Sequence, residues 1–448
     1  MAALKFIDDK PIVARFDGYG AQYNQNLFAQ RSKAVGATHV PALEKRLHAF
    51  QPHLVRIFFN ADAWDDEDLM RSYLKTLRLA QRTAGAINLT FQGLGPHVLK
   101  AHPDAIERFG DDLVQRVKKD KLTKLRWVTL RNEPNTQPPK PKPGKPRQKP
   151  LDKHLYRSWY VDLDARLKHA GLRSQIHLMG GDLIRPAQRP WLRFMAKNMH
   201  ELLDAYSVHI YWDYRHPQKL VERLKEVHDI VHVELPKKGF APKPLYVMEY
   251  GVRGIFGKHE PKPGHHASGR PMADTNVNAF QRAWFALEAA KRGYRGAVTW
   301  DGYFAKYDRE EMMFYSLVGK PEAGAWPLRP AFRVMRLLMS AARPGWKVVP
   351  VGGCKPNQCL VGFHGGAGKL AVAGLDTDGA HFDGGDSSSR TYTIGDLPAN
   401  TRFQLCFWNR DRDGRNTFDD KATSNDDGVV QITAPLHSVF VLTKPPIS

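Results

Sequence analysis

Short apolar runs alternate with longer amphipathic segments along most of the chain. The run HLVRIFFN (53–60), for example, precedes a segment in which Leu69, Tyr73 and Leu77 recur at helical spacing. Such runs predict buried strands, and the periodic segments predict helices packed against them. Eight pairs follow one another, with strands expected at 15–23, 53–60, 86–93, 125–133, 174–181, 205–212, 244–251 and 295–302, and helices at 42–50, around 69–77, and at 104–120, 155–171, 191–203, 218–231, 277–293 and 331–342.

The repeated strand–helix order favours a (β/α)8 TIM barrel over an open sheet. Eight units over roughly 330 residues suit a barrel with insertions. An open sheet often carries a glycine-rich phosphate loop after its first strand, and the sequence has none there. The expected fold class is therefore α/β, with functional residues at the carboxyl ends of the parallel strands.

The pattern changes near residue 342, where the helical periodicity stops. From Trp346 onward, short β runs such as KLAVAGLD and RFQLCFW alternate with turns rich in Gly, Asp and Asn. This pattern predicts an antiparallel β-sandwich of about 100 residues. We therefore expect a barrel over 1–342 and a sandwich over 343–448, and residues 1–15 are candidates for a strand that crosses over to the sandwich.

Two inserts interrupt the barrel pattern after polar strand ends. TQPPKPKPGKPRQKP (136–150) is rich in Pro and Lys, a composition that favours an extended loop, and GKHEPKPGHHASGRPM (257–272) follows a later strand. In a barrel both inserts would border the functional face. Two long inserts there would wall off a pocket rather than leave an open cleft.

Composition restricts the cellular setting. No run of about 18 apolar residues occurs, so no membrane-spanning helix is expected. The start, MAALKFIDDK, lacks the basic-then-apolar order of a signal peptide. The protein is expected to be either cytoplasmic or a secreted or periplasmic form whose leader is absent from this sequence.

The net charge is +21, from 67 Lys and Arg against 46 Asp and Glu. A basic surface attracts polyanions in general, so an acidic polysaccharide, nucleic acid or another anionic surface are all conceivable partners. A non-catalytic barrel that binds such a polymer through basic loops is one hypothesis. The basic insert at 136–150 contains no aromatic residue, which disfavours nucleic acid.

The three cysteines lie in the last quarter of the chain. Cys354 and Cys359 flank the turn-like tetrapeptide KPNQ and could form a disulfide across a hairpin, which would indicate an oxidising compartment. Cys406 lies in FQLCFW and is expected in the core. Neither the spacing nor nearby His residues suggest a zinc site.

Two carboxylic acids end apolar strands. Glu133 directly follows the run WVTLRN, and Glu249 directly follows the run YVM. A carboxylate is costly to bury without partners, so these positions indicate chemistry. Two carboxylates converging at a barrel mouth are what glycosidic bond cleavage requires: one protonates the leaving oxygen, and the other attacks the anomeric carbon or activates water.

The motif NEP, with a second Glu three strands later, resembles the clan A glycoside hydrolases, which are retaining (β/α)8 enzymes. The resemblance covers roughly residues 15–340. It implies that Glu133 is the acid/base and Glu249 the nucleophile, that no cofactor is required, and that the substrate is a β-linked glycoside, oligosaccharide or polysaccharide.

Five further positions match the clan. Asn132 matches the Asn that binds the sugar 2-hydroxyl, and Arg56 matches the Arg that keeps the nucleophile ionised. His209 and Tyr211 match a His-x-Tyr pair beside the two acids, and Trp300 matches a sugar-stacking Trp. At the end of the third strand, where family 5 carries a His, the sequence offers Gln92 and, five residues later, His97. Families 39 and 30 therefore fit as well as family 5.

Other polar and aromatic residues have two interpretations. Asp301 and Asp182 could bind sugar hydroxyls or cap loops, and Trp212 and Tyr303 could form outer sugar subsites or pack in the rim. The run NRDRDGRNTFDD (409–420) places Asn409, Asp411, Asp413 and Asp420 at calcium-loop positions, with Gly414 at the sixth. Flanking helices are not expected there, so a polar hairpin is the default and no metal is expected.

Overall fold

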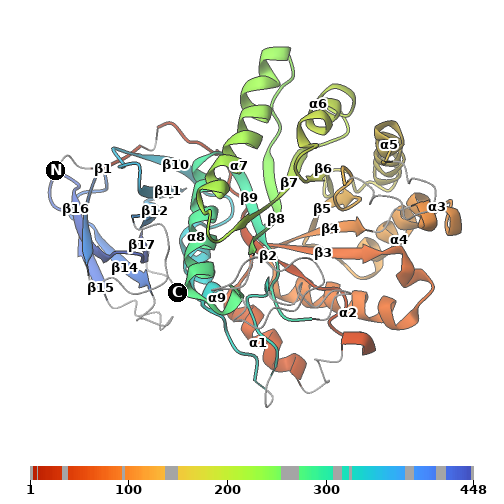
Figure 1. Ribbon diagram of the computed structural model, residues 1–448, viewed down its shortest axis with the longest axis horizontal. Helices are drawn as coiled ribbons and strands as arrows, with labels where there is room; N and C mark the ends of the chain where they lie inside the picture. The colour runs from red at the N-terminus through yellow and green to blue at the C-terminus, as the bar shows by residue number, and fades with distance from the viewer. Residues whose placement is uncertain are drawn as a thin grey trace.

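The protein is described by a computed structural model over residues 4–7, 9–32, 39–92, 96–136, 150–253, 272–305, 315–321, 325–378, 388–409 and 420–444. Figure 1 shows a strand barrel surrounded by helices and, beside it, a smaller β domain where the N-terminus lies.

Eight parallel strands close into a barrel, which confirms the predicted fold. They are β2 (Gly18–Tyr23), β3 (Leu54–Asn60), β4 (Ala86–Gln92), β5 (Leu125–Leu130), β6 (His177–Leu183), β7 (Ala205–Asp213), β8 (Leu245–Arg253) and β9 (Tyr294–Thr299), and β2 pairs with β9 to close the ring.

Helices surround the barrel, and the predicted helices each correspond to one of them. The α-helices are α1 (Val40–Phe50), α2 (Glu67–Thr83), α3 (Pro96–Ala101), α4 (Ala105–Lys119), α5 (Lys153–His169), α6 (Gln188–Asn198), α7 (Gln218–Asp229), α8 (Asn276–Lys291) and α9 (Pro330–Ala341). Short 3-10 or π turns lie at η1 (Gln30–Ser32), η3 (Ala61–Trp64), η4 (Ile230–Glu234), η5 (Pro236–Lys238) and η6 (Met272–Asp274).

Asp66 and Asp152 cap α2 and α5, because each side chain accepts hydrogen bonds from two backbone N–H groups of the first turn.

Strand β3 shows how the sequence places polar groups inside the barrel. Its successive side chains point alternately to the helices and to the barrel interior. Phe59 points outward, with its ring centroid 4.9 Å from that of Tyr73 on α2 and 5.8 Å from that of Phe109 on α4. Arg56 and Phe58 point inward, and the guanidinium carbon of Arg56 lies 4.3 Å from the Phe58 ring centroid.

The second domain is a mostly antiparallel β-sandwich, as predicted. Its strands are β1 (Leu4–Phe6), β10 (Lys347–Gly352), β11 (Gln358–Gly366), β12 (Lys369–Asp376), β13 (Ser389–Gly395), β14 (Arg402–Trp408), β15 (Asp420–Thr423), β16 (Val430–Pro435) and β17 (Val439–Lys444), in the order β15-β14-β17-β12-β11-β10-β1-β13-β16. Phe6, Leu405, Ile432 and Phe440, from strands far apart in this order, share one buried core. The strands therefore fold over on themselves into two layers.

The N-terminal segment reaches the sandwich. Strand β1 pairs antiparallel with β10 and parallel with β13, and Val13 forms an isolated bridge with Val348. The opposite layer packs on α8 and α9, the helices next to β8 and β9, and buried side chains such as Val361 and Phe363 join the barrel's core cluster. The sandwich therefore supports one side of the barrel.

The structure contains no disulfide between Cys354 and Cys359. Continuing the β10–β11 register places Cys359 opposite Gly352 rather than opposite Cys354. The thiol of Cys354 donates to the carbonyl of Val351, and the buried Cys359 thiol is hydrogen-bonded to Glu288 of α8. The two cysteines therefore do not take the facing positions that the possible disulfide would need.

Several predicted features fall outside the described residues. They include most of the insert at 136–150, the insert at 257–272 except Met272, and the calcium-loop residues Asp411 and Asp413 with the side chain of Asp420. In the described part of the chain, none of the helices has the length and apolar character needed to cross a membrane.

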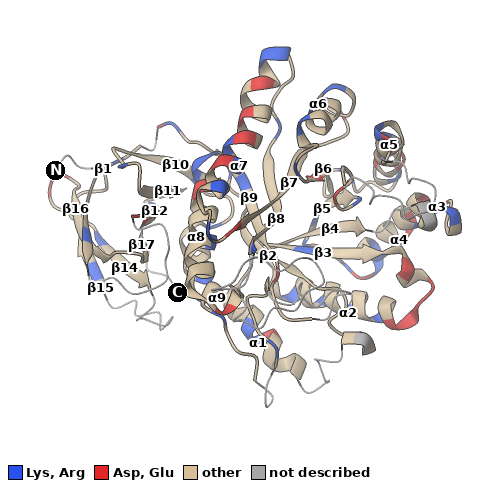
Figure 2. Ribbon diagram, in the orientation of Figure 1, with Lys and Arg blue, Asp and Glu red and all other residues tan. Residues whose placement is uncertain are grey.

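Figure 2 shows Lys and Arg on helices around the barrel and on the sandwich, with acidic residues among them, as along α7. In this view the blue segments lie on several helices and strands of both domains.

Candidate active site

The carboxyl ends of β5, β6, β7 and β8 bring polar side chains together at one end of the barrel. Glu133 lies three residues beyond β5, in a turn where Arg131 and Glu133 have φ values of 71° and 47°. Glu249 lies within β8 and pairs in register with His209 of β7. Parallel strands present these residues on the same face of the barrel.

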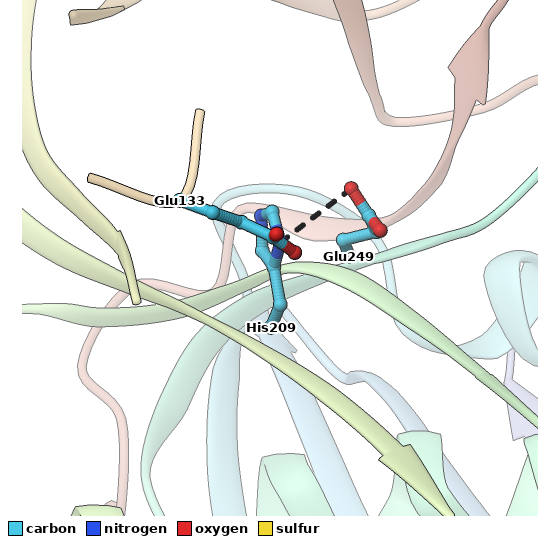
Figure 3. A group of neighbouring side chains, drawn as sticks. All are labelled: Glu133, His209 and Glu249. Carbon is cyan, nitrogen blue, oxygen red and sulfur yellow. Dashed lines mark hydrogen bonds and ion pairs between the residues drawn. The ribbon is translucent and has the colours of Figure 1, made fainter. Parts of the chain in front are cut away.

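Two carboxylates meet at the ring of His209, as Figure 3 shows. Its Nδ1 lies 3.0 Å from Oε1 of Glu133 and 3.5 Å from Oε2 of Glu249. One oxygen of each carboxylate and one ring nitrogen all lie within 4.8 Å of one another. Glu133 and Glu249 therefore converge on one small volume, although 116 positions separate them in the sequence.

Arg56 is fully buried beneath this pair and has several acceptors. Its Nη1 donates to Oε2 of Glu249 across 2.9 Å, and its Nη2 donates to Oδ1 of Asn132 across 2.7 Å. The same Nη2 lies 2.5 Å from Oδ2 of Asp182, and Nε donates to Oγ1 of Thr90 across 3.0 Å. One guanidinium thus positions Glu249 and the Asn132 side chain together.

Tyr211 holds the other oxygen of Glu249. Its hydroxyl donates to Oε1 across 2.5 Å, so each carboxylate oxygen has a different donor. The guanidinium carbon of Arg253 lies 5.2 Å from the Tyr211 ring centroid, and the Tyr315 ring packs edge-on at 5.8 Å. The orientation of Glu249 is therefore fixed by donors from β7, its neighbour, and from β3 across the barrel.

The charges of the site depend on one another. Burial disfavours the ionised form of Glu133, but the hydrogen bond and charge of His209, with the charge of Arg56, lower the pKa of Glu133 below its usual value. Burial disfavours the imidazolium form of His209, yet the charges of Glu249 and Asp182 and the hydrogen bond to Glu133 raise its pKa to about 9. Burial and the charge of Glu249 raise the pKa of Tyr211 well above its usual value. At neutral pH, His209 is therefore an imidazolium beside two carboxylates, and Tyr211 remains a neutral donor.

Asp182 is the central residue that the sequence analysis underestimated. It was considered for sugar binding or loop capping, but it is fully buried and binds side chains of the site instead. Beside its contact with Arg56, its Oδ1 accepts from Oγ of Ser207 across 2.7 Å and lies 3.5 Å from Nε2 of His209. Burial opposes its charge, but Arg56 and His209 hold the pKa of Asp182 well below its usual value.

Gly181 explains how β6 brings Asp182 so close to β7. Its φ is +130°, and a Cβ atom there would lie 2.2 Å from the carbonyl oxygen of Ser207. Only glycine permits this backbone conformation and this approach without displacement. Asp182 could be noticed in the sequence because, like Glu133, it ends an apolar strand, but its close contact with β7 depends on this packing at Gly181.

Trp300 lies at the same end of the barrel. Its ring centroid is 6.0 Å from that of Phe58, the ring beneath Arg56, and only 6% of the residue is exposed. Gln92 ends β4 two residues beyond Thr90 and is partly buried on the same strand face. His97 lies in α3, and its side chain is outside the described part of the structure.

Three proposed sugar contacts belong to the protein interior. Trp212 is buried, stacks on Phe285 with centroids 5.0 Å apart, and donates from Nε1 to Gln281. His209 and Tyr211 point into the barrel, so strand alternation directs Trp212 to the helices. Tyr303 is buried with its hydroxyl on the carbonyl of Asn24, and the buried Asp301 accepts the Gly302 N–H across 2.8 Å. The burial of Trp212 and Tyr303 excludes the outer subsite roles considered for them, and Asp301 makes the loop-capping contact that was the other interpretation of that residue.

Glu133, His209 and Glu249 are also the one group of potential metal ligands among the described residues. Their donor types suit a divalent cation. However, the guanidinium of Arg56 already binds Oε2 of Glu249, and His209 is itself positively charged beside the same oxygens. A bound cation would have to displace or repel both groups, so the arrangement favours acid–base chemistry without a metal.

No protein-family model matches the sequence, and comparison with curated proteins gives no match. Solved structures do match along almost the whole chain. The catalytic domain of GH30 xylanase C from Talaromyces cellulolyticus matches with a TM-score of 0.67 at 12% identity, covering 99% of both chains. A GH30 endoxylanase from Clostridium papyrosolvens C71 matches with 0.67 at 11%, covering 99% of both chains. AbfB, a family 51 alpha-L-arabinofuranosidase from Bifidobacterium longum, matches with 0.68 at 13%, covering 98% of this chain and 99% of that chain. The chain therefore shares its two-domain fold with these proteins.

Proposed function

We propose that the protein is a retaining glycoside hydrolase in which Glu249 is the nucleophile and Glu133 the general acid/base. The observation that carries the proposal is the convergence of the two carboxylates, whose ligand oxygens lie within 4.8 Å of each other. Retaining enzymes need carboxyl groups about 5–5.5 Å apart, whereas inverting enzymes need about 6.5–9.5 Å to admit a water molecule.

In the first step, Glu249 attacks the anomeric carbon. The bond from that carbon to the leaving oxygen breaks, the leaving oxygen takes a proton from Glu133, and an ester forms on Glu249. Arg56 and Tyr211 each donate to one oxygen of Glu249, which fixes its attacking orientation. His209 can supply the proton that Glu133 needs, because its Nδ1 lies 3.0 Å from Oε1 of Glu133.

In the second step, Glu133 acts as a base. It takes a proton from water, the water oxygen attacks the anomeric carbon, and the ester bond to Glu249 breaks. Once the leaving oxygen has taken its proton, Glu133 is ionised and His209 is neutral. The pair can therefore accept the proton that water releases in the second step, as the base function of Glu133 requires.

The experiment is hydrolysis of a panel of aryl β-pentosides and β-hexosides by the wild type and by Glu249→Ala, with and without azide. We expect the variant to be inactive and azide to restore turnover with an α-glycosyl azide product, because azide enters from the face that Glu249 occupied. A β-glycosyl azide, or full activity of Glu249→Ala, would contradict the assignment. Binding of natural glycans or polyanions without any cleavage would favour a non-catalytic role.

An anionic glycan is the substrate class that we propose within this function. Arg253 lies on the same face of β8 as Glu249, is exposed, and stacks over Tyr211. In the described part of the chain, no acidic side chain forms an ion pair with Arg253. Burial and the positive charge of Arg253 lower the pKa of the nearby Arg223. A guanidinium so placed suits a sugar carboxylate.

The test compares neutral oligosaccharides with matched oligosaccharides that carry uronic acid units. For Arg253→Gln we expect kcat/KM to fall roughly tenfold or more on the uronic acid substrates only, because a charged hydrogen bond contributes about 1.5–3 kcal/mol. Arg343→Gln is a matched control, because Arg343 follows α9 and hydrogen-bonds to the Ser340 carbonyl. Equal losses on both substrate classes would argue against carboxylate recognition.

Exo action and export complete the proposal. The two long inserts follow Glu133 and Glu249 in the sequence and favour a walled pocket, so analysis of products from a reduced oligosaccharide should show release from one end. A polymeric substrate would meet the enzyme outside the cytoplasm, and fractionation of producing cells tests that location.

A further inference from the structure

Beneath the two catalytic carboxylates lies a third, Asp182, to which the proposed reaction gives no step. It is fully buried at the end of β6, and its two oxygens face different cations. Oδ2 accepts from Nη2 of Arg56, and Oδ1 lies 3.5 Å from Nε2 of His209. On the opposite side of the same imidazole, Nδ1 faces Glu133. Asp182, His209 and Glu133 thus form a line across the site.

The backbone and Ser207 fix Asp182 in this line. Its own N–H donates to Oγ of Ser207 across 2.7 Å, and that hydroxyl donates back to Oδ1 across 2.7 Å. Gly181 permits the close approach of β6 to β7 that this exchange requires. A buried carboxylate with this many donors retains its charge, and that charge acts on neighbours through a medium of low dielectric.

Among the residues that the structure describes, the charged or titratable groups around His209 all belong to this site. They are Arg56 from β3, Glu133 after β5, Asp182 from β6, Tyr211 from β7 and Glu249 from β8. Glu133 and Glu249 change charge or become esterified during the proposed reaction, and Arg56 is permanently positive. Asp182 is therefore the one negative charge in this set that stays constant throughout the cycle.

We propose that Asp182 is a positioning residue whose fixed negative charge keeps one proton on the His209–Glu133 pair, ready for delivery to the leaving oxygen. The proposal rests on the glycosidase function for its purpose. In the first step the proton passes from Nδ1 of His209 to Oε1 of Glu133 and on to the leaving oxygen. In the second step Glu133 takes a proton from water and can return it to His209, so the pair regains what it lost.

The closing experiment follows the His209 ring by NMR in enzyme labelled at histidine, using His209→Gln to assign its signal. We expect the ring to titrate near pH 9 in the wild type. In Asp182→Asn, which keeps the shape but removes the charge, we expect titration lower by about one pH unit or more. Ser207→Ala is the matched control, because it removes a hydrogen bond to Asp182 but leaves the charge, so the ring should still titrate near pH 9.

A kinetic measurement tests the same role independently. For a glycoside with a poor leaving group, the basic limb of kcat/KM against pH should move to lower pH in Asp182→Asn by a shift similar to that of the ring, and should not move in Ser207→Ala. A variant with merely loosened structure would lose activity at every pH without shifting the limb.

Each outcome decides one point. An unchanged His209 titration in folded Asp182→Asn overturns the proposal. If that variant does not fold, the wild type still tests the proposal. A His209 ring that titrates at or below the ordinary histidine pKa of 6.5 would overturn it. The NMR result is independent of turnover, so a failure to cleave any glycoside would count against the proposed function and not against this role of Asp182.

Discussion

Tyr211 and Glu249 lie on neighbouring strands, and the phenol of Tyr211 donates a hydrogen bond to Oε1 of Glu249 across 2.5 Å. Burial and the charge of Glu249 raise the pKa of the phenol, so it remains a donor at any pH at which the enzyme would work. Arg56 occupies the other oxygen. The nucleophile therefore has one neutral and one charged donor, which can be removed separately.

Tyr211→Phe should lower kcat/KM about 10- to 100-fold, because a hydrogen bond to a charged group contributes roughly 1.5–3 kcal/mol. Steady-state kinetics on the best aryl glycoside measures it. Tyr206→Phe is the matched control, since Tyr206 lies on the same strand and its buried hydroxyl has no hydrogen-bond partner among the described residues. If both substitutions lowered kcat/KM equally, the hydroxyl of Tyr211 would have no specific role in catalysis.

Glu133→Gln should depend strongly on the leaving group. General acid catalysis contributes roughly 100- to 10,000-fold, so kcat/KM should fall by that factor for substrates with a poor leaving group. Dinitrophenyl glycosides need little protonation, and their first step should be almost unaffected. Pre-steady-state kinetics should then show a burst, because the second step lacks its base. A uniform loss across leaving groups would mean that Glu133 is not the acid.

Stability should fall at alkaline pH through His209. Its pKa is raised from 6.5 to about 9 in the folded protein, so its stabilisation is fully present below pH 6.5 and disappears as the pH rises through 9. The decrease in the free energy of unfolding should be about 3 kcal/mol at most. Urea titrations at pH 6.5 and pH 9.5 measure it. His209→Gln should remove most of this dependence, and an identical slope in that variant would place its origin elsewhere.

Trp212→Ala should reduce stability by about 3–5 kcal/mol, the usual cost of truncating a buried aromatic residue. The reason is its stacking against Phe285 and its hydrogen bond to Gln281. Chemical unfolding measures the loss. Activity per folded molecule should fall much less than in Tyr211→Phe, although the two residues are adjacent. A specific increase in KM at full stability would instead restore Trp212 as a sugar contact.

The sequence pattern was sufficient for the fold because eight apolar runs and eight periodic segments require one consistent arrangement of layers. It located Glu133 and Glu249 as candidates, since polar residues at the ends of apolar strands converge in a barrel, whereas Arg56, His209 and Tyr211 became candidates through the resemblance to clan A. The error at Trp212 was avoidable, because His209 and Tyr211 already fix which side of β7 faces inward.

Other features required three-dimensional information. The part played by Asp182 depends on how closely β6 approaches β7 at Gly181, which is a property of strand packing and not of one segment. The absence of a disulfide depends on a register that places Cys359 opposite Gly352. Tyr303 and Asp301 follow the last barrel strand, where nothing in the local sequence indicates that the chain turns back into the core.

Strand β1 also determines the order in which the protein can be completed. It is made first during synthesis, whereas β10 and β13, its two neighbours in the sandwich, are made only after all barrel strands. The barrel is thus topologically an insertion between the first and second strands of the smaller domain. A fragment that starts at residue 343 would lack the strand that joins β10 to β13, and a fragment that ends at 342 would leave that strand without neighbours. Neither part can therefore be excised with all of its strand pairings intact.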